Sequence, residues 1–296
     1  MRKKYKILLF TITIVVVVIL TATAIFWIST RNKKFNGERA YADVKFQVDL
    51  GPRTMGSQAH DLVSKWIISS LVNQQWKVDT QEAVTSGVAI KNIIAKRGSG
   101  APWIIIGSHY DSRSYADNDP TSQNRKLPVP GANDGASSVA VLLELARVIP
   151  NNLDKHIWLV FFDAEDNGNA FGTGWELGSE YFVSKLSGQP DNVIILDMIG
   201  DKDLNIYMEG NSNPDLNNEI WDVASELGYS QFIPKYKYNL TDDHIPFRNA
   251  GIRAVDVIDF DYPYWHTVND TADKVSSESL QVVGDVIMKW LEQYPK

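Results

Sequence analysis

Residues that could bind a cation recur directly after apolar, strand-like runs of this sequence. Such runs lead into His109, into the adjacent pair Glu165 and Asp166, and into Asp197. A single aspartate after a strand is usually a helix cap, and Asp134, which precedes a helix-like segment, could have that role. Five or more carboxylates at one edge of a sheet, however, would repel one another strongly unless a cation neutralised them. The pattern therefore indicates a metal site.

The residue types at this site restrict which metal it could hold. The chain has five His and no Cys, so any metal must be bound by nitrogen and oxygen. Two further imidazoles, His244 and His266, lie near the carboxyl end, and imidazole with carboxylate suits Zn²⁺. The absence of Cys also excludes disulfides, iron–sulfur clusters and a cysteine nucleophile. Because Glu165 and Asp166 are adjacent on a turn, one can bind the metal while the other acts as a general acid and base.

Alternating helical and strand periods predict the elements that must position these residues. We expect an α/β sandwich with a largely parallel central sheet, in which the site lies beyond the carboxyl ends of the strands. The predicted helices cover residues 57–76, 136–148, 180–186, 217–227 and 276–290. The predicted strands cover residues 77–84, 88–96, 103–108, 156–162, 192–196, 204–208 and 254–258, with a loop over 112–130.

An uncharged apolar run from Ile7 to Ile28 precedes the globular part. It is long enough to cross a bilayer as a transmembrane helix. The alternative is a cleaved signal peptide, since Ala22-Thr23-Ala24 matches a cleavage pattern. We therefore expect residues 1–34 to be a membrane anchor or signal segment and residues 35–296 to be the catalytic domain. Either interpretation places this domain outside the cytoplasm, anchored to the membrane or secreted.

Charge separates these two parts. Residues 1–34 carry seven Lys and Arg and no acid, whereas residues 35–296 carry 22 Lys and Arg against 36 Asp and Glu. A domain with a net charge of −14 is a poor partner for a phosphate backbone, so we expect no nucleic-acid binding.

Six stretches together resemble a known family. They are HYDS (109–112), GANDGASSVAVLLELA (131–146), FFDAED (161–166), LDMIG (196–200), DDHIPF (242–247) and WHT (265–267). This ordered set is similar to the zinc-dependent glutaminyl cyclases, which share a fold and ancestry with the zinc exo-aminopeptidases. The resemblance covers residues 43–294 and implies a three-layer α/β sandwich with a mixed central sheet.

The resemblance also implies roles for particular residues. Asp134, Asp166 and His266 would be the zinc ligands, and Glu165 would shuttle the proton. Asp197 and Asp242 would form a hydrogen-bonded acid network beside the metal, and Trp265 would wall the substrate pocket. The implied reaction converts the N-terminal glutamine of a peptide or protein to pyroglutamate with release of ammonia: Glu165 takes a proton from the α-amine and passes it to the departing ammonia.

Two other interpretations remain open at this stage. The related aminopeptidases bind two zinc ions through residues at the positions of His109, Asp134, Asp166, Asp197 and His266, and all five are present. Three features favour the cyclase: the doubled acid Asp242-Asp243, the tryptophan before His266, and the stretch WELGS (175–179) after the carboxylate pair. A membrane-tethered binding protein without catalytic activity would be expected to lack a ligand or the shuttle carboxylate, and neither is missing.

We expect residues 1–34 to be dispensable for catalysis, because their evident role is to span or target the membrane. A protein truncated to residues 35–296 should be soluble and active. Size-exclusion chromatography and an activity assay on the truncated protein check this. Aggregation or loss of activity would show that the N-terminal segment is needed by the rest of the chain.

Overall fold

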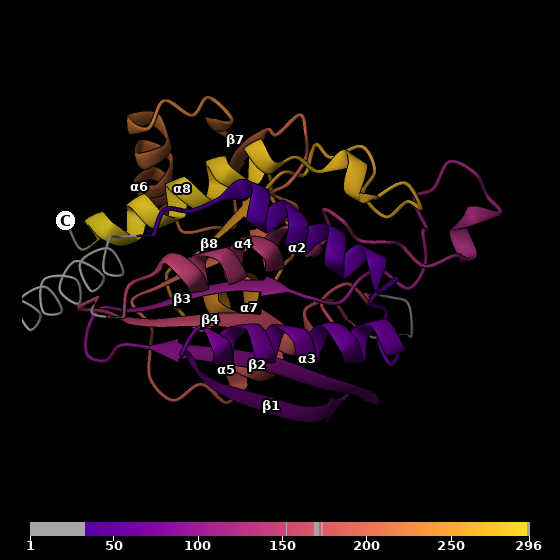
Figure 1. The fold of residues 1–296 in the computed structure, drawn as a ribbon, viewed down its shortest axis with the longest axis horizontal. Helices are drawn as coiled ribbons and strands as arrows, with labels where there is room; N and C mark the ends of the chain where they lie inside the picture. Colours follow the sequence, from indigo (N-terminus) through magenta and orange to yellow (C-terminus); the bar gives the residue numbers. More distant parts are fainter. Residues whose placement is uncertain (1–32, 152, 169–171, 173, 295–296) are drawn as a thin grey trace, which may run out of the picture. The chain divides into compact units, whose positions relative to one another are not determined.

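A six-stranded mixed sheet forms the centre of the fold, in the order β1-β2-β4-β3-β5-β8 (Figure 1). The computed structural model describes residues 33–151, 153–168, 172 and 174–294. The strands are β1 (Lys77–Thr85), β2 (Val88–Arg97), β3 (Trp103–His109), β4 (His156–Phe162), β5 (Asn192–Asp197) and β8 (Ala254–Ile258). Strands β4, β3, β5 and β8 run parallel, whereas β1 and β2 pair antiparallel at one edge. This confirms the α/β class and the mixed, largely parallel sheet.

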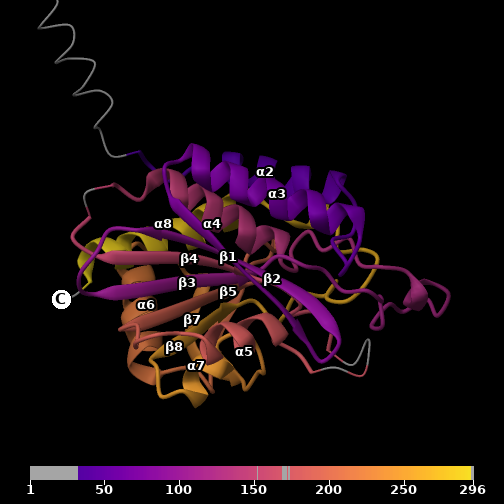
Figure 2. The ribbon, with the colours of Figure 1, turned by 90° about the horizontal axis from the view of Figure 1, so that it is seen from below.

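Helices cover both faces of the sheet (Figure 2). One face carries α2 (Gly37–Asp49), α3 (Gln58–Asn73), α4 (Ala136–Val148) and α8 (Ser277–Gln293), and the other carries α5 (Leu177–Ser184) and α7 (Ile245–Asn249). The β3 sequence explains why both faces are covered. Ile104 and Ile106 belong to one apolar cluster and Ile105 to the other, because successive strand side chains point to opposite faces.

A smaller unit flanks the β8 edge of the sheet. It contains the parallel pair β6 (Ile206–Glu209) and β7 (Phe232–Tyr238), together with α6 (Pro214–Glu226). The α6 helix buries Leu216, Ile220 and Val223 in the same core cluster as α8. This unit carries the loop that closes one side of the site described below.

Among the α-helices and strands of the described residues, three were not predicted from the sequence: α2, β7 and α7. The α2 helix buries only Gly37, Ala40, Val44 and Gln47, so few large apolar side chains mark it in the sequence. Most of β7 is exposed and the strand contains Pro234, while α7 has only five residues. The α5 helix begins at Leu177, three residues before the predicted start.

The predicted membrane-spanning segment lies outside the described residues. Within the described part of the chain, every helix is too short or too polar to cross a bilayer. Anchoring therefore stays a prediction from the sequence.

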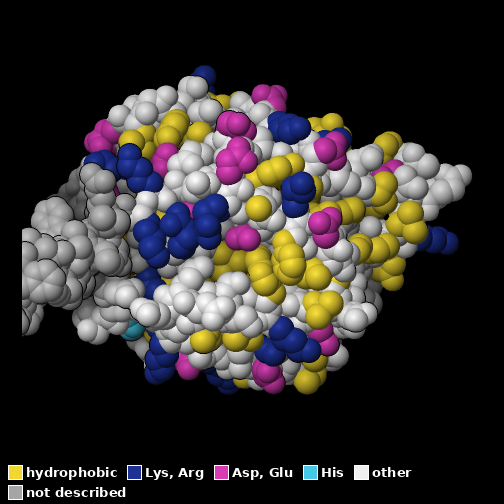
Figure 3. Space-filling view, viewed as in Figure 1, with side chains coloured by type: hydrophobic (Ala, Val, Ile, Leu, Met, Phe, Trp, Pro, Cys, Tyr) yellow, Lys and Arg dark blue, Asp and Glu magenta, His cyan; other side chains and the backbone are white. Residues whose placement is uncertain are grey.

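The excess of acidic groups is largely inside the domain. Sixteen of the 36 Asp and Glu side chains are buried, against three Lys and Arg in the described residues. On the helical face drawn in Figure 3, Lys, Arg, Asp and Glu are intermixed with apolar side chains. The expectation that the acidic domain is a poor partner for a phosphate backbone stays a prediction, because 16 of the acidic groups on which it rests are buried.

Candidate metal centre

Two groups of buried His and Asp side chains lie where the parallel strands end. The first group is Asp134, Asp166 and His266, and the second is His109, Asp134 and Asp197. Within each group the possible ligand atoms lie within 4.8 Å of one another. Asp134 belongs to both groups. The structure thus brings together all five residues that the sequence proposed as ligands for one or two metal ions.

The first group has carboxylate oxygens that are free to bind a cation. His266 Nε2 lies 3.1 Å from Asp166 Oδ1 and 3.7 Å from Asp134 Oδ2. Both Asp166 oxygens and Asp134 Oδ2 are buried and accept no hydrogen bond from any described residue. Buried oxygens without donors are costly unless a cation satisfies them. The donor set of two carboxylates and one imidazole therefore fits Zn²⁺.

The second group is arranged around His109. Its Nε2 lies 3.1 Å from Asp197 Oδ1 and 3.2 Å from Asp134 Oδ1. Asp134 does not cap α4: the helix begins after Gly135 without a side-chain cap. Gly135 is required here, since a Cβ on it would lie 2.7 Å from His109 Cε1 and Nε2.

Three residues beside these ligands have left-handed backbone conformations. They are Ala164 (φ 56°), Met198 (φ 47°) and His266 (φ 56°), none of which is a glycine. Ala164 lies directly before Glu165, and Met198 follows Asp197. Such conformations are unfavourable for residues with a Cβ and concentrate at functional sites. The turns after β4 and β5 are therefore bent to present these side chains at the expense of local backbone energy.

Two buried aspartates hold the ligand-bearing turns by their backbone. Asp111 Oδ1 accepts a hydrogen bond from Glu165 N (3.2 Å), and its Oδ2 accepts one from Asp166 N (3.2 Å). Asp270 does the same for the other turn, accepting from Asn133 N (2.8 Å) and Asp134 N (3.2 Å). Each ligand turn is thereby fixed by a carboxylate that does not itself belong to either group.

A fully buried arginine joins the same loops. Arg53 donates from its guanidinium to the backbone oxygens of Tyr110, Pro130 and Gly131. Burial lowers the pKa of Arg53, while Asp270 and Asp134 favour its charged form. It therefore supplies one of the few buried positive charges near the ligands.

Glu165 is 8% exposed and lines a cavity together with the first ligand group. Burial raises the pKa of Glu165 well above its usual value, and the nearby carboxylates of Asp242 and Asp166 raise it further. Burial likewise raises the pKa of Asp197 to about 7. Carboxyl groups with pKa values raised toward neutrality can both accept and release a proton, as general acid–base catalysis requires.

Asp197 and Asp242, the residues of the expected acid network, both line the cavity beside the first group. Among the described residues, no direct hydrogen bond joins Asp197 to Asp242. Asp197 contacts His109, while burial and the nearby carboxylates of Asp242 and Asp197 raise the pKa of Asp256 well above its usual value. His244 lies 3.1 Å from Glu209 and 3.9 Å from Asp256, and it belongs to neither candidate metal group of the described residues.

A cavity of about 210 Å³ opens onto the first group. Five carboxylates line it together with apolar side chains; its full lining is Asp134, Glu165, Asp166, Trp175, Asp197, Met198, Asn239, Leu240, Thr241, Asp242, Ile258, Phe260, Trp265 and His266. Trp265 lies on its wall, with its ring centroid 4.0 Å from that of His266. Trp175, from one of the stretches that favour the cyclase, stacks on His266 with ring centroids 5.9 Å apart.

Buried Glu209 fixes the loop that forms one side of this cavity. Its Oε1 accepts hydrogen bonds from Leu240 N and Asn211 N, both at 2.8 Å, and its Oε2 accepts one from Ser212 N at 2.7 Å. Leu240 lines the cavity. The short strand β6 thus ends in a carboxylate that positions part of the cavity wall.

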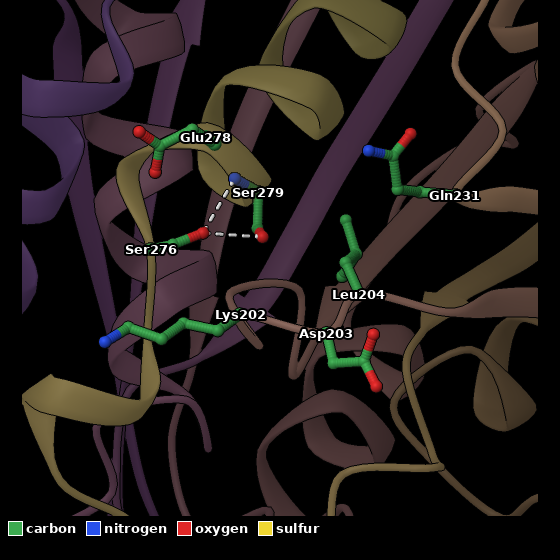
Figure 4. A pocket seen from close by; sticks show the side chains of 7 residues that line it. All are labelled: Lys202, Asp203, Leu204, Gln231, Ser276, Glu278 and Ser279. Atoms are coloured by element: carbon green, nitrogen blue, oxygen red, sulfur yellow. Dashed lines mark hydrogen bonds between the residues drawn. The ribbon is translucent and has the colours of Figure 1, made fainter.

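Another depression, of about 420 Å³, lies beside the N-terminal end of α8 (Figure 4). Its two carboxylates, Asp203 and Glu278, point away from each other, and no histidine lines it. Ser276 Oγ accepts a hydrogen bond from Ser279 N at 3.1 Å, as a helix cap does. This depression is larger than the cavity beside the first group, but its side chains do not converge on a point where a metal could bind. The smaller cavity is therefore the candidate site.

Comparison with known proteins agrees with this geometry. The model of Peptidase family M28 matches residues 92–291. A glutaminyl cyclase structure from Bacteroides thetaiotaomicron superimposes with a TM-score of 0.83 and 32% identity, covering 89% of this chain and 99% of that one. A Zn-dependent exopeptidase from Parabacteroides distasonis gives a TM-score of 0.84 and 30% identity, covering 89% and 100%.

An aminopeptidase is also similar to this chain. Aminopeptidase YwaD of Bacillus subtilis is 29% identical over 202 residues, which are 62% of this chain and only 39% of that protein. The family and the zinc-dependent structures indicate zinc, and the two His and Asp groups are candidate sites for it. Since the family model covers most of the described fold and both ligand groups, the chain belongs to Peptidase family M28.

Proposed function

We propose that the protein is a zinc-dependent glutaminyl-peptide cyclotransferase. It would convert the N-terminal glutamine of peptides or proteins to pyroglutamate and release ammonia. The observation that carries the proposal is the cavity that Glu165 lines together with the first ligand group and the apolar side chains of Trp265, Phe260 and Leu240. The similarity to bacterial glutaminyl cyclases over nearly the full length of those chains supports it.

Asp134, Asp166 and His266 would hold the zinc. When bound, Zn²⁺ supplies a Lewis acid that polarises the γ-amide carbonyl of the substrate. Glu165 takes a proton from the substrate α-amine, which frees its lone pair for attack on that carbonyl, and gives the proton to the departing ammonia. Acidic side chains around the cavity attract the cationic α-amine before this step.

The apolar wall favours cyclisation over hydrolysis. Cyclisation requires the glutamine side chain to fold back toward its own amine while water is kept away. Trp265 and Phe260 form such a wall. Their ring centroids are 4.8 Å apart, and Trp265 also lies beside His266.

A zinc aminopeptidase is the second candidate. It is favoured by the second group, because His109 and Asp197 complete a site that shares Asp134 with the first. In that reaction Glu165 would take the proton of a water that attacks the first peptide bond. Loss of the shuttle carboxylate or of a ligand would have favoured an inactive binding protein, and all of these residues are present.

We further propose that residues 1–34 place the enzyme at a membrane, with the catalytic domain outside the cytoplasm, or direct its secretion. The proposal is supported by the uncharged run from Ile7 to Ile28. Its substrates would then be N-termini of exported proteins or of extracellular peptides.

Exchanging the two adjacent carboxylates should separate catalysis from metal binding. Glu165→Gln is nearly isosteric but cannot accept and release the proton, so it should lower kcat by at least about 100-fold with zinc still bound. Asp166→Asn should lose both activity and zinc. Zinc content after dialysis, measured beside turnover, checks this. Equal loss of metal in both variants would reverse the two assignments.

The mass of the product decides between the two reactions. The protein is incubated with peptides that begin with Gln and with matched peptides that begin with Leu or Ala. We expect loss of ammonia from the Gln peptides with the chain intact, and weaker activity in Trp265→Ala. Release of free Leu or Ala would overturn the cyclase and establish the aminopeptidase.

Metal removal should change how stability depends on pH. In the folded metal-free chain, burial raises the pKa of Asp197 from its ordinary value of 3.8 to about 7. The folded state therefore binds more protons between about pH 4 and pH 7, and the free energy of unfolding should fall as the pH rises through this window.

Urea unfolding with a chelator present measures this dependence. Asp197→Asn, which cannot ionise, should reduce the fall, and bound zinc should also reduce it, because a nearby cation favours the charged form of Asp197. Identical slopes for the wild type and Asp197→Asn would contradict the prediction.

A further inference from the structure

The His266 imidazole faces carboxylates from both ring nitrogens. Its Nε2 points to the first ligand group, 3.1 Å from Asp166 Oδ1, while its Nδ1 lies 3.4 Å from Asp117 Oδ1. Asp117 belongs to the loop between β3 and α4 and to none of the stretches that resemble the family. Its side chain is 46% exposed, so it lies at the edge of the site.

Backbone hydrogen bonds hold this loop in register with the His266 segment. Asn118 N donates to His266 O at 3.2 Å, and Val268 N donates to Asp119 Oδ2 at 3.2 Å. These two hydrogen bonds join the residues next to Asp117 to the segment of His266, and they therefore fix the position of Asp117 beside the imidazole.

His109 has the same arrangement in the second group. Its Nε2 faces Asp134 and Asp197, and its Nδ1 lies 3.6 Å from Asp111 Oδ1. A carboxylate beside Nδ1 favours the tautomer with its proton there, which leaves the Nε2 lone pair for a metal. The two histidines thus each have an aspartate behind them, one near in sequence and one distant.

Arg113 connects Asp117 to the other ligands of the first group. This buried guanidinium donates to Asp117 Oδ1 (3.2 Å) and Oδ2 (2.6 Å). It also donates to the backbone oxygens of Asp166 (3.2 Å) and Gly168 (2.9 Å). Trp175 lies against both Arg113, at 4.7 Å, and His266. One arginine therefore ties the turn that carries Asp166 to the carboxylate behind His266.

Asp117 also affects the charge near the first ligand group, because it neutralises Arg113. Arg113 Nη1 lies 3.9 Å from Asp166 Oδ1, so a guanidinium without a counter-charge would weaken the attraction of Asp166 for a cation. Asp117 neutralises Arg113 through the two-point contact.

We propose that Asp117, held by Arg113, is a positioning residue that orients His266 and thereby raises the affinity of the first group for zinc. This inference rests on the proposed zinc enzyme. It predicts an effect on metal binding in the absence of substrate, so it does not depend on which of the two reactions the protein catalyses.

The test is the zinc dissociation constant of the full chain, measured by competition with a chromogenic chelator. Asp117→Ala should weaken zinc binding about 10- to 100-fold, the range found when carboxylates behind metal-binding histidines are removed. Asp117→Asn keeps the size and a hydrogen-bond acceptor and should lie between Ala and wild type. Asp203→Ala, which removes an aspartate from the depression of Figure 4, should bind zinc like the wild type.

Thermal unfolding of the metal-free proteins shows whether the variants fold. A folded Asp117→Ala or Asp117→Asn protein that binds zinc as tightly as the wild type would overturn the inference and leave the proposed function intact. A wild type that binds no zinc would instead refute the proposed function itself.

Discussion

The fold depends on how it accommodates carboxylates that are buried together at the carboxyl edge of the sheet. Burying a charge is costly unless it is paired, hydrogen-bonded, bound to a cation or neutralised by a proton. The molecule uses several of these solutions. Asp111 and Asp270 accept backbone N–H groups, and Glu209 accepts both backbone and Ser212 hydroxyl donors. Asp134 and Asp166 retain oxygens with no donor among the described residues, and there a cation is the remaining solution.

The supporting residues show that the site is organised in advance of any ligand. Two aspartates fix the backbone of the ligand turns, Arg53 fixes the loops around them, and Glu209 fixes part of the cavity wall. Left-handed residues beside the ligands have a conformational cost that only a surrounding network of this kind sustains. Under the proposed function, preorganisation of this kind would let a small cavity hold a proton acceptor, a metal ion and apolar side chains around a single substrate residue.

Much of this could be predicted from the sequence, and the limits are physical. Strands buried on both faces appear as continuous apolar runs, so β3, β4 and β5 were recognised with their terminal polar residues. The roles of Asp117 and Arg53 were not predicted, because their contacts join segments far apart in the chain and no local sequence pattern indicates such contacts. Composition likewise gave the number of acidic groups but not that many are inside. The segment before residue 33 remains known only by its sequence.

The most direct test of the account is to locate zinc in crystals of the zinc-loaded protein by anomalous diffraction at the zinc absorption edge. The account predicts a full peak among the side-chain atoms of Asp134, Asp166 and His266, with any second, weaker peak between His109 and Asp197. A zinc-saturated protein whose metal lies elsewhere, with these carboxylates unligated, would contradict it.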